Sequence, residues 1–263
     1  MAAAALAVVT GIGIASASAS SSTHNWIETG WNIHLANQAD SGTASHFFNT
    51  SGSFGTGAAS SASPVQDGFS TSAVLTYTSY AQFASDVQNN AITYPYRWVM
   101  YDAESWSQTP LNEQRSPAKY MRLFGKLAHA KGYKVIETPA RDLGGVKGSA
   151  CTAKSGENLN VWYVRCNIAG AAAANSDVYV LQDQVNTSDV SAYSSLFTSV
   201  RKQALAANPK VAVDSELSTN YGSASDMAAA ARSVNADGFY LSVTSSAIGQ
   251  ADQFLQEMQT AGY

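Results

Sequence analysis

From residue 73 onward, the sequence repeats a short apolar run followed by a segment with helical spacing. The strand-like runs cover residues 73–78, 98–102, 133–137, 178–181, 211–213 and 238–243. Strands that alternate with helices of this length are typical of a parallel sheet, because each helix carries the chain back to the start of the next strand. The pattern therefore predicts an α/β fold.

The helix that follows residues 98–102 has the clearest boundaries. Ser116 is a typical N-cap, Pro117 suits the first helical position, and Lys131 with Gly132 marks the end. Further helices are predicted at about residues 80–90, 190–204 and 225–233, with a closing helix that ends at Gly262. Each of them lies between two strand-like runs or after the last one.

The six units predict a (β/α)8 TIM-type barrel if residues 23–72 add two more. Residues 40–72 are rich in Ser, Gly and Ala without clean periodicity, so they hold either an irregular strand and a loop or part of a disordered linker. The chain has 263 residues, and barrels of this kind commonly use about 250 residues as one domain. We expect a single barrel domain over residues 23–263. A doubly wound open sheet is the alternative, but the Gly-rich turn typical of that fold is missing.

Residues 1–22 resemble a secretory signal peptide. An apolar stretch is followed by alternating Ala and Ser, although the positively charged n-region is missing. A disordered Ala/Ser tail is the alternative, and the apolar run is too short and broken for a membrane span. In an exported protein, the two cysteines, Cys151 and Cys166, are expected to form a disulfide. The sequence thus predicts a secreted, extracellular protein.

The charge distribution excludes several classes of partner. Charged residues make up 13% of the chain, and no Lys or Arg precedes Arg97, so the first 96 residues carry a charge of about −4. Without a basic stripe, neither nucleic acid nor an acidic membrane surface is an expected partner. We expect a monomer that needs no cofactor and acts on a carbohydrate or another small molecule.

Four strand-like runs end in carboxylates, which predicts an active site where the C-terminal ends of parallel strands meet. Asp102 and Glu104 share one face of their strand because they are two residues apart, and so do Asp214 and Glu216. Crowded carboxyls raise one another's pKa, so one can hold a proton while its neighbour is ionised. Glycoside hydrolysis needs this division between a proton donor and a nucleophile or base.

We therefore predict a glycoside hydrolase with Glu104 as acid/base, at the end of strand four, and Glu216 as nucleophile or second carboxylate, at the end of strand seven. The predicted supporting residues are acids that tune this pair, aromatic rings for sugar stacking, and polar side chains for binding: Asp102, Glu137, Asp183, Asp214, Arg141, Trp106, Gln182, Gln184 and Tyr240. Arg141 has two open roles, as an ion-pair partner of one carboxylate or as a site for an anionic substrate group. The aromatic rings have core packing as their alternative.

Other functions are also compatible with these residues. The acids could cap helices, which is the simplest role for Asp142 and Asp189. The barrel could bind carbohydrate without cleaving it, or the acids could hold Mg²⁺ or Ca²⁺ in a metal-dependent hydrolase or lyase. The four histidines have no zinc-binding spacing, and no G-x-S-x-G nucleophile motif occurs, so we predict no metal centre of that kind and no serine hydrolase.

Several motifs resemble an uncharacterised family of exported (β/α) barrels from soil actinobacteria. They are YDAESW at residues 101–106, TPARDL at residues 138–143 and ANP at residues 207–209. The resemblance covers roughly residues 73–263. It implies a barrel fold and export, and it implies no activity.

Overall fold

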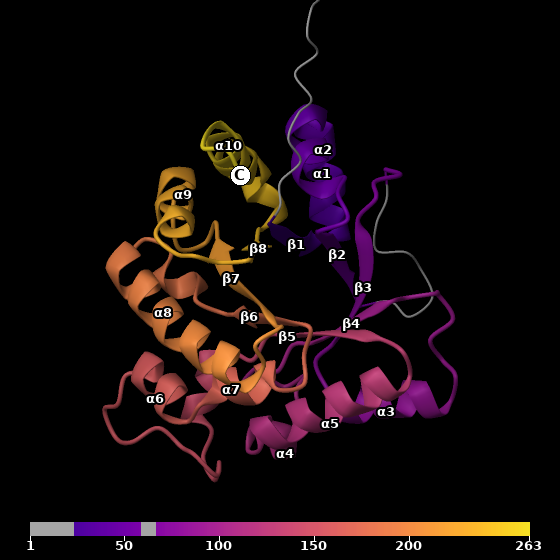
Figure 1. The fold of residues 1–263 in the computed structure, drawn as a ribbon, viewed down its shortest axis with the longest axis vertical. Helices are drawn as coiled ribbons and strands as arrows, with labels where there is room; N and C mark the ends of the chain where they lie inside the picture. The colour runs from indigo at the N-terminus through magenta and orange to yellow at the C-terminus, as the bar shows by residue number, and fades with distance from the viewer. Residues whose placement is uncertain (1–23, 59–66) are drawn as a thin grey trace, which may run out of the picture.

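A computed structural model describes residues 24–58 and 67–263, and in it eight parallel strands form a closed barrel (Figure 1). The strands are β1 (Asn25–Thr29), β2 (Ser53–Gly57), β3 (Ser72–Tyr77), β4 (Trp98–Tyr101), β5 (Lys134–Glu137), β6 (Val178–Leu181), β7 (Ala212–Ser218) and β8 (Gly238–Ser242). Each strand pairs with the next one along the chain, and β8 pairs with β1. The predicted (β/α)8 barrel is confirmed.

Helices surround the strands (Figure 1). They are α1 (Gly30–Ala39), α2 (Ser41–Phe48), α3 (Tyr80–Gln88), α4 (Leu111–Gln114), α5 (Pro117–Ala130), α6 (Leu159–Arg165), α7 (Ile168–Ala173), α8 (Val190–Ala207), α9 (Ala224–Arg232) and α10 (Ile248–Thr260), with short 3-10 turns η1 (Arg141–Gly145), η2 (Gln184–Asn186) and η3 (Ser245–Ala247). The last helix, α10, packs against α1 and α2, so the helical ring closes together with the barrel.

The N-terminal part supplies the two strands that the barrel needs. Asp40 ends α1 and caps α2 by accepting hydrogen bonds from the amides of Gly42 and Thr43. Strand β2 follows with the sequence SFGTG, in which only one side chain is large and apolar. This explains the weak sequence pattern of residues 40–72. The predicted leader, residues 1–22, lies outside the described residues.

Alternate residues of the strands fill the interior of the barrel. One apolar cluster consists of side chains that point inward: Ile27, Phe54, Val74, Met100, Ile136, Val178 and Val180. A larger apolar cluster lies between the strands and the helices. At the closure of the barrel, Gly238 leaves no room for a side chain, because a Cβ there would collide with Asn25. The inward positions nearer the C-terminal strand ends are polar, and they carry the candidate site.

Cys151 and Cys166 form the predicted disulfide, with their Cα atoms 6.0 Å apart. The bond joins the long loop after β5 to the C-terminal cap of α6. By restricting the unfolded chain, a bridge over this separation contributes about 3 kcal/mol to stability. Among the described residues, no helix is long and apolar enough to cross a membrane.

Candidate active site

Gln182 holds two carboxyl groups together at the mouth of the barrel. Its side-chain nitrogen Nε2 donates to Asp102 Oδ1 at 2.9 Å, to Glu104 Oε1 at 3.2 Å and to the carbonyl oxygen of Thr138 at 2.9 Å. Asp102 and Glu104 follow β4, and Gln182 follows β6, so two strand ends on different sides of β5 define this geometry. The predicted pairing of Asp102 with Glu104 is present.

Asp102 and Glu104 form one proton-sharing unit. Burial raises the pKa of Asp102 well above its ordinary value, and the neighbouring charge of Glu104 raises it further. Burial also raises the pKa of Glu104, against the effect of hydrogen bonds from Gln182 and Asp102. Since the two carboxyls are hydrogen-bonded to each other, one of them carries a proton.

Glu216 lies near this pair, on β7. Its side chain is only 5% exposed, and its Oε2 atom has no hydrogen-bond partner in the part of the chain that the structure describes. Burial raises the pKa of Glu216 well above the ordinary range, and the charges of Asp102 and Glu104 add to this effect. A hydrogen bond from Ser242 acts in the opposite direction. Three carboxyls from β4 and β7 thus interact electrostatically at the mouth.

Glu28, at the end of β1, is a fourth carboxyl that the sequence prediction missed. It accepts hydrogen bonds from the Thr29 amide at 2.6 Å and from Asn32 Nδ2 at 3.1 Å. Burial raises the pKa of Glu28 to about 8, and its charge helps to raise the pKa of Glu216. The signal was present in the sequence, because Glu28 follows the apolar pair at residues 26–27 just as the predicted acids follow their strands.

Tyr240 joins the same group from β8. It pairs in register with Glu216 on one side and with Ile27 on the other. Its hydroxyl is hydrogen-bonded to Thr56, and the charges of Asp102 and Glu216 help to raise its pKa well above the ordinary value. Its predicted contact with a sugar remains a prediction.

A cavity of about 360 Å³ opens beside Glu104. It is lined by Glu104, Ala140, Arg141, Asp142, Leu159, Gln182, Gln184, Val185 and Tyr221. Arg141, Gln182 and Gln184, three of the predicted binding residues, therefore face one space together with the predicted acid/base. Tyr221, in the loop after β7, was not among the predicted site residues. Its side chain is 48% exposed.

Arg141 forms an ion pair with Asp183 and also donates to Asn160. Its Nη1 atom lies 3.2 Å from Asp183 Oδ1, and Asp183 is fully buried. Burial raises the pKa of Asp183 to about 7, while Arg141 and a 2.6 Å hydrogen bond from Asn186 act to lower it. Of the two roles predicted for Arg141, the structure shows the ion pair. Asp183 is thus a buried partner of Arg141, and its predicted catalytic role stays a prediction.

Two further predicted acids lie elsewhere. Glu137 pairs in register with Tyr101 and Tyr179, which belong to the outer apolar cluster, so its side chain faces the helices. It is fully buried, and neither of its carboxyl oxygens has a hydrogen-bond partner within the described ranges. Asp214 faces inward but lies deep in the barrel, beside Asn25 and Gly238 at the first residues of β1 and β8. The predicted strand ended at residue 213, whereas β7 continues to Ser218.

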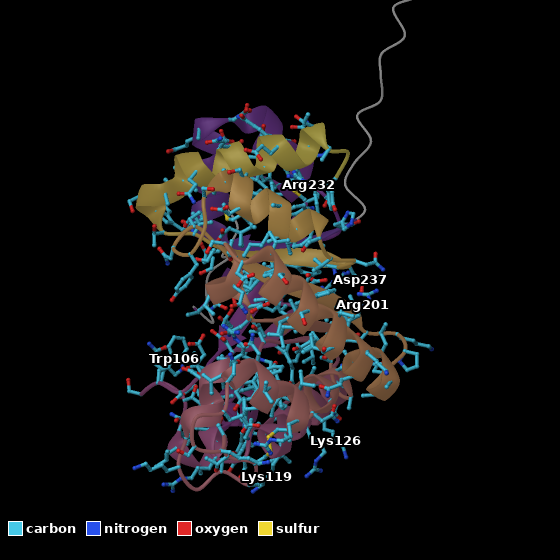
Figure 2. The ribbon with its side chains drawn as sticks, turned by 90° about the vertical axis from the view of Figure 1, so that its left-hand side faces the viewer. Trp106, Lys119, Lys126, Arg201, Arg232 and Asp237 are labelled. Carbon is cyan, nitrogen blue, oxygen red and sulfur yellow. A yellow bond between two sulfur atoms is a disulfide. The ribbon has the colours of Figure 1, made fainter. Side chains whose placement is uncertain are left out.

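The remaining predicted residues divide between the mouth and the helix ends. Trp106 is half-buried, and its indole nitrogen donates to Thr109 Oγ1 at 2.8 Å. Figure 2 shows Trp106 on the side of the molecule opposite Asp237, which directly precedes β8. Asp189 caps α8, as predicted. Asp142 does not cap a helix; it accepts a hydrogen bond from the Ser105 amide at 3.0 Å and lines the cavity.

Comparison with known proteins finds only distant structural neighbours. No known family profile matches the chain, and no functionally curated protein is detectably similar to it in sequence. The carboxyl transferase domain of Rhizobium etli pyruvate carboxylase shares 8% identity over 92% of this chain, with a TM-score of 0.49. This chain spans about half of that domain's length, 47%. A Rhizomucor miehei beta-1,3-glucanosyltransferase shares 10% identity, with a TM-score of 0.44 and coverage of 84% of this chain and 86% of that one. The resemblance to an actinobacterial family stays a prediction.

Among the described residues, no three His, Cys, Asp or Glu side chains are arranged so that they could hold a metal ion. The carboxyls at the mouth interact through a shared proton and through Gln182. The site is therefore best described as a carboxyl cluster beside a cavity.

The buried Asp214 leads to a prediction about stability. Burial raises its pKa to about 8, so the folded protein binds more protons than the unfolded chain between about pH 4 and pH 8. Its contribution to stability is therefore lost as the pH rises through this window. Asp214→Asn keeps an acceptor for Asn25 and should raise the free energy of unfolding on the order of 2 kcal/mol at pH 9, with little change at pH 4. Urea unfolding at both pH values measures this; an equal effect at both would contradict it.

Proposed function

We propose that this protein hydrolyses glycosidic bonds with Glu104 as acid/base and Glu216 as the second carboxylate. The observation that carries this proposal is the hydrogen-bonded Asp102–Glu104 pair, held by Gln182 near the buried Glu216 and open to the cavity through Glu104. The barrel count also supports it, because Glu104 follows β4 and Glu216 lies on β7.

The proposed chemistry follows from these positions. Glu104 lines the cavity, so it can donate the proton of the Asp102–Glu104 pair to the oxygen of the leaving sugar. Ionised Glu216 then attacks the anomeric carbon or takes a proton from the attacking water. Asp102 supports Glu104 by sharing its proton, and Gln182 fixes the geometry of both carboxyls.

Substrates with different leaving groups test the two roles. An aryl glycoside with a dinitrophenyl leaving group departs without protonation, whereas a sugar leaving group needs an acid. We expect Glu104→Gln to retain cleavage of such an aryl glycoside and to lose cleavage of the oligosaccharide. Glu216→Gln should lose both reactions. The reverse pattern would exchange the two roles.

The pH profile of kcat/KM gives a second test. Activity requires Glu216 ionised, and burial raises its pKa with help from the charge of Asp102, so the acid limb should lie above the ordinary carboxylate range. Asp102→Asn removes that charge and should move the acid limb to lower pH by about 1 unit. An acid limb that stays in place would show that Asp102 does not act on Glu216.

We also propose that the protein is exported. The Cys151–Cys166 disulfide supports this, since such bonds persist mainly in oxidising compartments. Mass spectrometry of the protein secreted by the native host should detect a chain that begins after residue 22. A cell-retained protein with intact residues 1–22 would contradict export.

A further inference from the structure

Positive charge is almost absent from the mouth of the barrel. Of the seven segments that join a strand to a following α-helix, only the one after β5 contains Lys or Arg: Arg141, Lys147 and Lys154. Figure 2 shows Arg201 and Lys126 on the side of the molecule away from Trp106. The chain as a whole carries a net charge of −4.

The cavity itself follows the same pattern. Its charged lining residues are Glu104, Asp142 and Arg141, and Arg141 already forms an ion pair with Asp183. Glu216 does not line the cavity, but it interacts electrostatically with Glu104, which does, and its buried Oε2 atom has no hydrogen-bond partner among the described residues. A concave site that is lined by acidic side chains and has walls of low dielectric constant concentrates a positively charged ligand. The missing group at this mouth is therefore a cation with hydrogen-bond donors.

We propose that the cavity selects a glycan that carries free amino groups, so that the substrate class is an amino sugar polymer. An ammonium group can donate charge-assisted hydrogen bonds to carboxylates, which are stronger than those between neutral groups. Tyr221 adds an exposed aromatic ring on the cavity wall, over which a cation or a sugar ring can lie. The claim that the amino glycan is a substrate rests on the proposed function, whereas the claim that the cavity binds it does not.

Binding of a cation has a measurable consequence. Burial and the charges of neighbouring carboxyls raise the pKa values of Asp102, Glu104 and Glu216, so these groups keep their protons to higher pH than ordinary carboxyls do. A bound ammonium group stabilises the ionised carboxylates and lowers these pKa values. The protein should therefore release protons when it binds an amino glycan, and none when it binds a neutral one.

Isothermal titration calorimetry tests the proposal with oligomers of glucosamine and of galactosamine, each compared with its fully N-acetylated counterpart. We expect at least 10-fold tighter binding of an amino form, a loss of that preference at high salt, and a heat that varies with the ionisation enthalpy of the buffer. Asp142→Asn should reduce the preference, whereas Glu257→Gln on α10, which lies outside the cavity lining, should not.

The outcomes separate the two proposals. Equal binding of amino and acetylated forms, preference for the acetylated form, or no binding of any oligomer overturns the amino-glycan proposal. If neutral glycans are then cleaved, the proposed hydrolase function stands without it. Selective binding of an amino oligomer with proton release but no cleavage supports the present inference and overturns the hydrolase.

Discussion

Replacing Glu104 or Glu216 with glutamine is expected to lower kcat/KM for an oligosaccharide by about 10³-fold, the usual size of a lost acid–base contribution. Each change keeps the shape of the side chain and removes its ability to exchange a proton or to carry charge. In Glu104→Gln, the shared proton no longer reaches the leaving oxygen. In Glu216→Gln, the group that should attack or activate water is neutral.

Stability measurements must accompany these variants. Glu216 is buried with a raised pKa, so Glu216→Gln should keep or increase the free energy of unfolding at neutral pH. Glu257→Gln is the matched control, because it makes the same chemical change on α10, and it should leave kcat/KM unchanged. Turnover retained in both site variants would remove Glu104 and Glu216 from the mechanism.

Glu113→Ala is expected to destabilise the fold by about 3 to 5 kcal/mol, because each buried donor that loses its acceptor costs about 1 to 3 kcal/mol. Glu113, on α4, is almost completely buried and accepts four hydrogen bonds. The donors are the amides of Tyr80 at 2.7 Å and Ala81 at 3.0 Å, Ser79 Oγ at 3.2 Å and Tyr101 Oη at 2.7 Å. Its removal leaves the first turn of α3 and a buried hydroxyl without their acceptor.

Asp189→Ala is the control for this effect, because Asp189 is exposed and caps α8 through one hydrogen bond to the Ala192 amide. Loss of a single exposed cap costs about 1 kcal/mol. Urea denaturation should therefore show a several-fold larger loss for Glu113→Ala. An equal loss in the free energy of unfolding for the two variants would show that Glu113 contributes no more to stability than an ordinary helix cap.

The sequence predicted the fold well where the strands are apolar and the helices have clear ends. Pro117 begins α5 as predicted, and the six strand-like runs correspond to β3–β8. Strand β2 gave little signal because SFGTG holds two glycines and one large apolar residue. Its place is fixed by pairing with β1 and β3, and contacts of that kind are not encoded in the local pattern.

Predicting the candidate site required knowing which way each side chain faces. Residues two apart share a face, so Asp102 and Glu104 were correctly paired by spacing. Glu137 and Asp183 needed the register as well, because a shift of one position turns a side chain from the barrel interior to the helices. Asp214 was misplaced since β7 continues beyond residue 213. The sequence does not show where pairing with a neighbour ends a strand.

Release of new reducing ends from a broad glycan panel tests the central claim most directly. The panel should include amino, N-acetylated and neutral oligosaccharides, and it should be run with the wild-type protein and with the double variant Glu104→Gln/Glu216→Gln, each with and without a chelator. The account predicts cleavage of at least one glycan by the wild type, unchanged by the chelator, and none by the double variant. Binding without any cleavage would identify a carbohydrate-binding barrel, and activity lost with the chelator would identify a metal-dependent enzyme; either result would contradict the account.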